Sequence, residues 1–187
     1  MRKFKLQVQT TIDGHMAVPE GEPGWPSVPF TEDVYAYMYA LMESVDTIVL
    51  GRKIADEFIT AWASEIEDEP QALIDWINNA HKVVISRSLT DSQWDKVDVL
   101  RGGIVESVNK LKAQAGGDLI AYGGVELVSS LVANDLLDDL YLFVNPVAIG
   151  DGRPVFGDLD GHRRFRLVDA RAFDCGVVAL HYQPNGS

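Results

Sequence analysis

The chain has 187 residues, of which 47% are hydrophobic and 24% are charged, so its size and composition suit one ordinary globular α/β domain spanning residues 1–187. Its formal net charge of −12 argues against broad binding to nucleic acid or to an anionic membrane surface. The sequence shows no signal-peptide pattern, no apolar run long enough to span a bilayer and one cysteine, Cys175, and we therefore expect a reducing, cytoplasmic location.

The first part of the chain predicts a strand, a long loop and a helix. Residues 4–9 alternate between apolar and polar side chains, which is typical of a strand. Residues 13–30 contain three glycines and four prolines and predict a loop long enough to serve as a lid. Thr31 is a suitable N-cap for the helix that follows. One face of that helix carries regularly spaced apolar residues: Val34, Met38, Leu41 and Val45.

The middle of the chain alternates between short apolar runs and helical patterns. Strands are predicted at residues 47–50, 82–86 and 119–122. Helices are predicted at residues 52–62, 72–79 and 125–132, and another begins at Ile104 and stops at Gly116-Gly117. The last third predicts a long strand at residues 140–149, a turn at residues 150–154, and two strands at residues 165–173 and 177–182. This order predicts a mixed, mostly parallel sheet with helices on both faces and a C-terminal antiparallel hairpin.

Two segments pass from a strand through glycine into a helix, at Gly51-Arg52-Lys53 and at Gly123-Gly124-Val125. Free N–H groups and the positive end of a helix dipole meet at such junctions, which suits an anionic ligand. Plain strand-to-helix turns and close helix–strand packing would also require glycine. Two junctions in one domain indicate the two ends of an elongated, phosphate-bearing cofactor.

Ser86-Arg87-Ser88 lies at the C-terminal end of a predicted strand, where open α/β sheets bind ligands. An arginine at this point can pair with a phosphate, although an ordinary capped turn explains the segment equally well. We predict no metal site, because one cysteine and four histidines without metal-ligand spacing cannot build one.

Five segments carry a resemblance when they are taken in order along the chain: Thr11-Ile12-Asp13-Gly14, Val49-Leu50-Gly51-Arg52-Lys53, Val84-Ile85-Ser86-Arg87-Ser88-Leu89, Tyr122-Gly123-Gly124, and Asn145-Pro146-Val147-Ala148-Ile149-Gly150-Asp151-Gly152. This set resembles the dihydrofolate-reductase-like superfamily. The matching branch contains the C-terminal reductase domain of the bifunctional riboflavin-biosynthesis deaminase/reductase and its stand-alone relatives. The resemblance implies a three-layer fold with a central eight-stranded sheet, NADPH as the hydride donor, and often a homodimer.

The resemblance also assigns cofactor-binding residues: Gly51, Arg52, Lys53, Ser86, Arg87, Ser88, Gly123, Gly124 and Val125. Gly123 and Gly124 would approach the pyrophosphate, while an arginine such as Arg87 would select NADPH through its 2′-phosphate. The family often has a threonine after the first glycine junction, but this chain has Ile54, which cannot donate a hydrogen bond.

On the substrate side, the resemblance matches Asp13 to an aspartate that faces the substrate, and we expect it to orient the substrate in the catalytic site. A turn-forming Asp-Gly pair is a strong alternative. Trp25 and Tyr35 are candidates to line a flat, apolar substrate pocket, although such aromatic residues often belong to the core.

The sequence therefore predicts an NADPH-dependent reductase of a small pteridine-like or pyrimidine-like heterocycle. One alternative is a non-catalytic nucleotide-binding or scaffold relative of the same fold. Another is a true riboflavin-pathway reductase, whose substrate carries a ribose phosphate and would need additional cations near the pocket. We expect no nucleic-acid or membrane partner.

Overall fold

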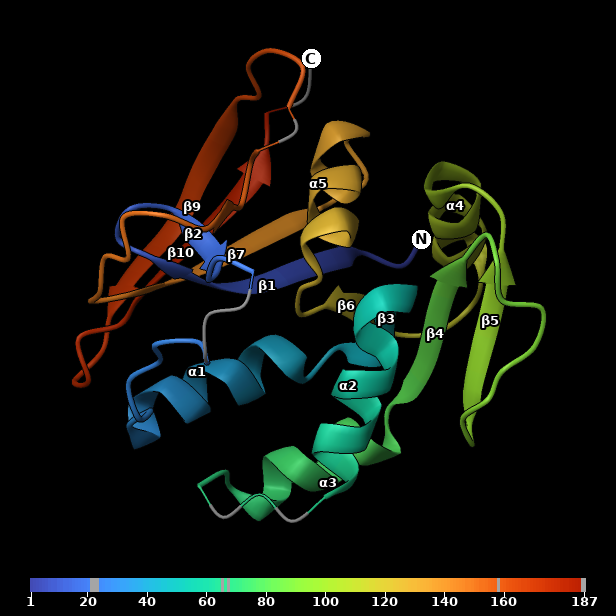
Figure 1. Ribbon diagram of the computed structural model, residues 1–187, viewed down its shortest axis with the longest axis horizontal. Helices are drawn as coiled ribbons and strands as arrows, with labels where there is room; N and C mark the ends of the chain where they lie inside the picture. The colour runs from blue at the N-terminus through green and yellow to red at the C-terminus, as the bar shows by residue number, and fades with distance from the viewer. Residues whose placement is uncertain (21–23, 65, 67, 158, 186–187) are drawn as a thin grey trace.

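A computed structural model describes residues 1–20, 24–64, 66, 68–157 and 159–185. Within these residues, eight strands form one sheet in the order β5-β4-β3-β6-β1-β7-β10-β9 (Figure 1). The strands, in chain order, are β1 (Phe4–Thr11), β3 (Val45–Gly51), β4 (His81–Ser86), β5 (Val97–Arg101), β6 (Asp118–Ala121), β7 (Asp139–Asn145), β9 (Phe165–Ala172) and β10 (Val178–Pro184). Two short strands, β2 (His15–Ala17) and β8 (Arg153–Pro154), pair separately in antiparallel fashion.

The sheet is mostly parallel, as the sequence predicts. All the ladders between β5 and β7 are parallel, and only β10 runs in the opposite direction, against both β7 and β9. β9 and β10 form the predicted C-terminal hairpin, which is closed by hydrogen bonds between Phe173 and Val177 and between Gly176 and Phe173. The predicted mixed α/β fold is therefore confirmed.

The sheet separates two groups of helices (Figure 1). The helices α1 (Glu32–Met42), α2 (Arg52–Ala63) and α3 (Gln71–Asn79) contribute to one buried cluster, and α4 (Ile104–Ala113) and α5 (Val125–Ala133) contribute to the other. Successive residues of β3 point to opposite faces, so Ile48 and Leu50 join the first cluster while Val49 joins the second. This continuous apolar run is typical of a strand that is covered on both faces.

Several expected boundaries differ from the structure. The sequence predicts a strand over residues 140–149, but β7 ends at Asn145 because Pro146 has no N–H to continue the ladder. Val45 opens β3 rather than extending the helix that carries Val34. The predicted loop at residues 13–30 contains β2, and its residues 21–23 lie outside the described residues.

Two further elements are not among those predicted from the sequence. One is β5, which pairs in parallel with β4 at the edge of the sheet. The turn at residues 150–154 ends in β8, which pairs with β2. Among the described residues, no helix is long and apolar enough to cross a membrane.

A buried acid links the parallel part of the sheet to the hairpin. Asp139, at the start of β7, accepts a hydrogen bond from Gln183 at 2.8 Å and contacts His181 Nε2 at 2.7 Å, both on β10. Burial alone would raise the pKa of Asp139, but the hydrogen bonds from Gln183 and His181 outweigh burial and lower it. The carboxylate form is therefore favoured by folding.

We predict that Asp139→Asn destabilises the protein by about 1–3 kcal/mol near neutral pH, because it removes a charged acceptor from a buried pair. Because the pKa of Asp139 is lowered in the folded state, the stability that its carboxylate contributes is fully present above about pH 4 and is lost as the pH falls further. Urea unfolding between pH 3 and pH 7 should show that the difference in free energy of unfolding between the variant and wild type becomes smaller below about pH 4.

The matched control is Asp98→Asn, since Asp98 pairs with His81 on the exposed surface. That variant should change the free energy of unfolding by less than about 1 kcal/mol. Equal effects of the two substitutions would show that the buried link adds no stability.

Candidate functional site

Three helices begin at one cavity, which has a volume of about 840 Å³. α2, α4 and α5 follow the ends of β3, β5 and β6, and their N-caps are Gly51, Gly103 and Gly124, all of which line the cavity. No side chain caps any of these N-termini. The cavity therefore meets uncapped N–H groups and the positive ends of three helix dipoles, a setting that favours an anion.

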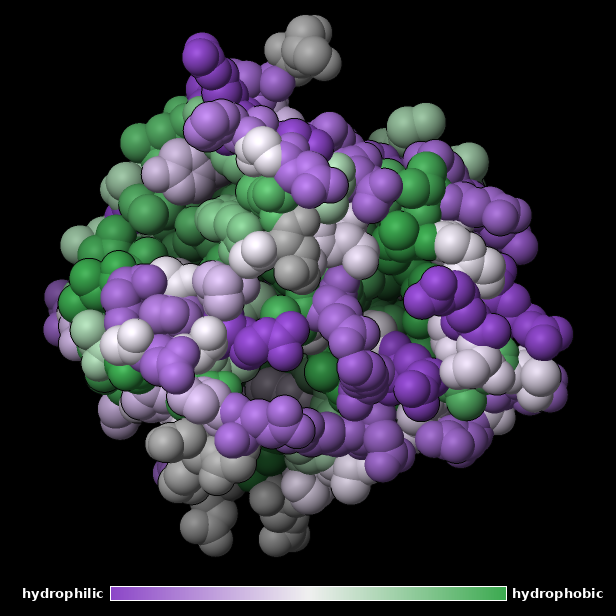
Figure 2. All heavy atoms as spheres, turned by 45° about the horizontal axis from the view of Figure 1, so that its top comes forward, coloured by the Kyte–Doolittle hydropathy of each residue, from purple (hydrophilic) through white to green (hydrophobic). Residues whose placement is uncertain are grey.

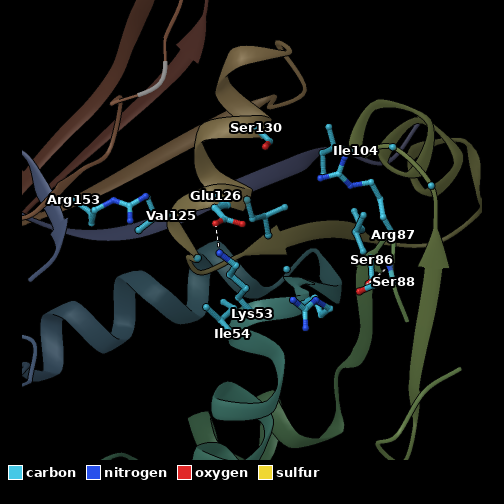
Figure 3. Close-up of a pocket in the computed structure, with 17 residues that line it drawn as sticks. Lys53, Ile54, Ser86, Arg87, Ser88, Ile104, Val125, Glu126, Ser130 and Arg153 are labelled. Atoms are coloured by element: carbon cyan, nitrogen blue, oxygen red, sulfur yellow. Dashed lines mark hydrogen bonds and ion pairs between the residues drawn. The ribbon is translucent and has the colours of Figure 1, made fainter. Parts of the chain in front are cut away.

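Basic side chains reinforce this preference. Among the described residues, four of them line the cavity, namely Arg52, Lys53, Arg87 and Arg153, together with one carboxylate, Glu126. Figure 3 shows Arg153 and Arg87 on opposite sides of an ion pair between Lys53 and Glu126. We call this space the charged cavity. Its lining carries three more positive than negative groups, in a chain whose net charge is −12.

The single acid in the charged cavity is compensated. Glu126 lies in the first turn of α5, where an unpaired carboxylate would repel a phosphate, and the hydrogen bond from Lys53 lowers its pKa. Among the described residues, Arg52, Arg87 and Arg153 have no carboxylate in ion-pair contact. These three guanidinium groups are therefore available to an anionic ligand.

The segment after β4 holds Arg87 at the cavity. The Ser86 hydroxyl accepts hydrogen bonds from the N–H groups of Ser88, at 3.1 Å, and Leu89, at 3.0 Å. Ser86 therefore shapes the turn, as the simpler interpretation of the sequence expects, while Ser86, Arg87 and Ser88 all line the charged cavity. The hydrogen bonds to Ser86 therefore both cap the turn and hold Arg87 beside the charged cavity.

A second cavity of about 340 Å³ adjoins the first, because Ile54 and Gly124 line both. We call it the apolar cavity, since most of its lining is aliphatic or aromatic: Val8, Met16, Val18, Trp25, Phe58 and Tyr122. Figure 2 shows hydrophobic surface lying between hydrophilic side chains on the visible face of the molecule. The two cavities form one elongated site with a charged end and an apolar end.

Ile54 lies where the two cavities meet. A Cβ atom added to Gly124 would lie 3.2 Å from Ile54 Cδ1, so the isoleucine packs closely against the glycine backbone. Gly124 also has a φ of +85°, a conformation that residues with a Cβ atom rarely adopt. Packing therefore accounts for an apolar residue at position 54, where the resemblance predicts a hydroxyl group.

The structure does not bring every predicted site residue into the cavities. Asp13 lines neither one, and its carboxylate accepts hydrogen bonds from the N–H groups of Ile149, at 3.1 Å, and Gly150, at 2.7 Å. Hydrogen bonding by Thr11 and Gly150 lowers the pKa of Asp13 far below its usual range. Asp13 thus joins two loops, as the turn interpretation expects, and its role at the substrate remains a prediction.

Tyr35 also lies outside both cavities. Its hydroxyl donates to Glu69 Oε2 at 3.1 Å, and its ring packs edge-on against Phe30. Burial and the nearby Glu69 raise the pKa of Tyr35 to about 12. Trp25, by contrast, lines the apolar cavity as predicted.

Some lining residues were not predicted from the sequence. Arg153 belongs to a segment that the sequence predicts to be a turn, and its place depends on the pairing of β8 with β2. Gly103 repeats the strand–glycine–helix order of the other two junctions, a signal that becomes visible once β5 is recognised as a strand. Phe58 gives no local signal of a site, whereas Tyr122 belongs to the Tyr122-Gly123-Gly124 segment of the resemblance.

The chain belongs to the RibD C-terminal domain family, whose sequence profile matches residues 2–179. This is a reductase-type family. The chain is 31% identical to the uncharacterised Bacillus subtilis protein YyaP over 193 residues, which cover 99% of this chain and 96% of that protein. It is also 26% identical to the uncharacterised Bacillus subtilis protein YwjB, over 97% of each chain.

Solved structures show the same fold at low sequence identity. A Shewanella protein assigned to riboflavin biosynthesis has a TM-score of 0.77 at 23% identity, with 98% of this chain and 99% of that chain covered. An Enterococcus faecalis dihydrofolate reductase complexed with NADP(H) has a TM-score of 0.64 at 16% identity, with coverages of 98% and 97%. A Thermotoga maritima deaminase/reductase has a TM-score of 0.69 at 17% identity, and the match covers 98% of this chain and 57% of that one.

We predict that Gly124→Ala destabilises the protein by about 2–4 kcal/mol, because it combines an unfavourable positive φ with a close contact to Ile54. Gly161→Ala is the matched control, since Gly161 has a φ of +87° but open space around it. The Gly161→Ala substitution should lower the free energy of unfolding by only about 1–2 kcal/mol. Thermal and urea unfolding would measure both, and equal losses would contradict the packing assigned to Ile54.

Proposed function

We propose that this chain is an NADPH-dependent reductase of a small heterocycle of the pteridine or pyrimidine type. The observation that carries the proposal is the continuity of the charged and apolar cavities at Ile54 and Gly124. A dinucleotide has the same division, since its phosphates are anionic and its nicotinamide ring is flat and largely apolar. Family membership supports the same cofactor class.

The charged cavity suits the phosphates of NADPH. Gly124 and the uncapped N-terminus of α5 would receive the pyrophosphate, because a glycine there allows the closest approach of the backbone. Arg87 lies farther along the cavity, beside the end of β4, and would pair with the 2′-phosphate (Figure 3). Arg52 and Arg153 add positive charge against the repulsive field of the acidic chain.

The apolar cavity would hold the nicotinamide ring against the substrate and exclude water from both. NADPH, when bound, supplies a hydride that adds to the carbon of a C=N or C=O bond. The heteroatom of that bond must then take up a proton. No aspartate, glutamate, histidine or lysine is among the described residues that line this cavity, so we propose water as the proton source. The protein would contribute orientation and a preorganised site.

We predict that the wild-type protein binds NADPH at least 10-fold more tightly than NADH, because only NADPH carries the 2′-phosphate that Arg87 would contact. Replacing Arg87 with glutamine should weaken NADPH binding roughly 10-fold or more and leave NADH binding within roughly 2-fold, since one charge-assisted hydrogen bond is lost. Quenching of protein fluorescence and enhancement of nicotinamide fluorescence would report both affinities.

The matched control for this measurement is Arg166→Gln on β9, a residue that lines neither cavity. It should leave both affinities unchanged. Absence of NADPH binding to the wild-type protein at millimolar cofactor would refute the proposed function, and equal losses for NADPH and NADH in Arg87→Gln would refute the assignment of the 2′-phosphate.

Turnover separates the proposal from the two alternatives. We predict that oxidised pteridines or pyrimidines accelerate NADPH oxidation, followed by absorbance at 340 nm. Binding of NADPH without acceleration by any such heterocycle would favour a non-catalytic nucleotide-binding or scaffold relative. Rescue of a riboflavin auxotroph that lacks the reductase would identify a riboflavin-pathway enzyme. The proposal also includes a homodimer, as the family resemblance implies, and a cytoplasmic location, as the single cysteine suggests.

A further inference from the structure

Arg153 comes to the charged cavity from a different part of the fold than the other basic residues that line it. Those residues belong to α2 or follow β4, whereas Arg153 belongs to β8, in the segment that returns from the end of β7. β8 pairs with β2, where Ala17 lies opposite Arg153 and lines the apolar cavity. Arg153 therefore lies on the side of the charged cavity that faces the apolar one.

The segment that leads to Arg153 is held by a side chain from elsewhere in the chain, that of Asp13. Its carboxylate accepts hydrogen bonds from the N–H groups of Ile149, at 3.1 Å, and Gly150, at 2.7 Å. Within the described part of the chain, no other side chain outside residues 146–152 bonds to their backbone. Asp13 is thus the one side-chain link between the turn after β1 and this segment.

The turn that carries Asp13 is itself fixed. The Thr11 hydroxyl accepts a hydrogen bond from the His15 N–H at 3.0 Å, and the Thr10 hydroxyl donates one to the His15 carbonyl at 3.0 Å. On the other side, Gly152 packs so closely on β2 that an added Cβ atom would clash with the Ala17 carbonyl. The two turns therefore interlock, and a rigid turn holds the segment that bears Arg153.

The position of Arg153 along the elongated site decides which phosphate it meets. Arg87, to which the proposed function gives the 2′-phosphate, lies on the opposite side of the charged cavity (Figure 3). The nicotinamide ring is assigned to the apolar cavity, which the β2 partner of Arg153 lines. Among the phosphates of NADPH, the one attached to the nicotinamide riboside is therefore the closest to Arg153, and a guanidinium group can donate two hydrogen bonds to one phosphate.

We propose that Asp13 is a positioning residue: by accepting hydrogen bonds from Ile149 and Gly150 it keeps β8 on β2, and it thereby holds Arg153 against the nicotinamide-side phosphate of NADPH. This inference rests on the proposed function. It gives the carboxylate a role in cofactor binding without direct contact with cofactor or substrate.

Simple electrostatics predicts the opposite sign for the same residue. Asp13 is an acid in the turn that packs on the segment bearing Arg153, so removing its charge would by itself strengthen the binding of an anion. The positioning role predicts weaker binding instead. The direction of the change therefore separates the hydrogen bonds of Asp13 from its charge.

The first experiment measures the affinities of Asp13→Ala for NADPH and for adenosine 2′,5′-bisphosphate, which lacks the nicotinamide-side phosphate. NADPH binding should weaken roughly 5- to 10-fold, while binding of the bisphosphate should stay within roughly 2-fold of wild type. Asp13→Asn keeps an oxygen acceptor for the two amides and should restore NADPH affinity to within roughly 3-fold of wild type.

The matched control is Asp151→Ala, which removes the same charge from the neighbouring loop. Asp151 is exposed, lines neither cavity and accepts a hydrogen bond only from the adjacent Gly152 among the described residues. Its replacement should leave both affinities within roughly 2-fold of wild type. Tighter NADPH binding in Asp13→Ala, equal losses for NADPH and the bisphosphate, or an equal loss in Asp151→Ala would overturn the inference.

The second experiment uses Arg153→Gln, alone and combined with Asp13→Ala. Because Arg153 is exposed and has no ion-pair partner among the described residues, its replacement should leave the melting temperature unchanged. Arg153→Gln alone should weaken NADPH binding roughly 10-fold and spare the bisphosphate, and Asp13→Ala should add less than roughly 2-fold to that loss.

Additive losses in the double variant would show that Asp13 does not act through Arg153. Unchanged NADPH affinity in Arg153→Gln would overturn the inference even if Asp13→Ala failed to fold, while NADPH binding by the wild-type protein would still support the proposed function. If the wild-type protein does not bind NADPH, the proposed function fails first and this inference fails with it.

Discussion

The site depends on one constraint, which is that parallel strands end at the same edge of a sheet. β3, β5 and β6 run in the same direction, and each is followed within a few residues by a helix. The helices α2, α4 and α5 must therefore begin side by side, with their dipoles converging on the charged cavity. Glycine is present at all three N-caps, so no side chain stands between the backbone amides and a ligand.

The described side chains that line the charged cavity are mostly basic, whereas the chain as a whole has a negative net charge. Lys53 and Glu126 neutralise each other, which removes the one acid from competition and leaves the guanidinium groups of Arg52, Arg87 and Arg153 without ion-pair partners among the described residues. A net charge of −12 repels anions at long range, but screening limits that repulsion to roughly 8 Å at physiological salt. Local cations and oriented amides can therefore dominate inside the cavity.

The apolar cavity shows the opposite balance, since none of the described residues that line it carries a charge. Ile54 lies at the boundary between the two cavities and packs against the backbone of Gly124. The same residue removes a hydroxyl from the phosphate side and adds an apolar wall to the other side. Ile54 in place of the expected threonine therefore changes the boundary between the charged and apolar cavities. It does not alter the three helix N-termini.

The sequence by itself determined the features that depend on neighbouring residues. Strand–glycine–helix junctions at Gly51 and Gly124, the turn at Ser86 and the C-terminal hairpin are all local, and the structure shows each of them where it was expected. Tertiary structure alone decided which distant residues meet. Arg153 reaches the charged cavity through the pairing of β8 with β2. Asp13 instead accepts hydrogen bonds from loop amides, and Tyr35 donates one to Glu69, so neither residue lines a cavity. Such contacts join residues from 34 to 137 positions apart, a separation over which no local pattern in the sequence carries information.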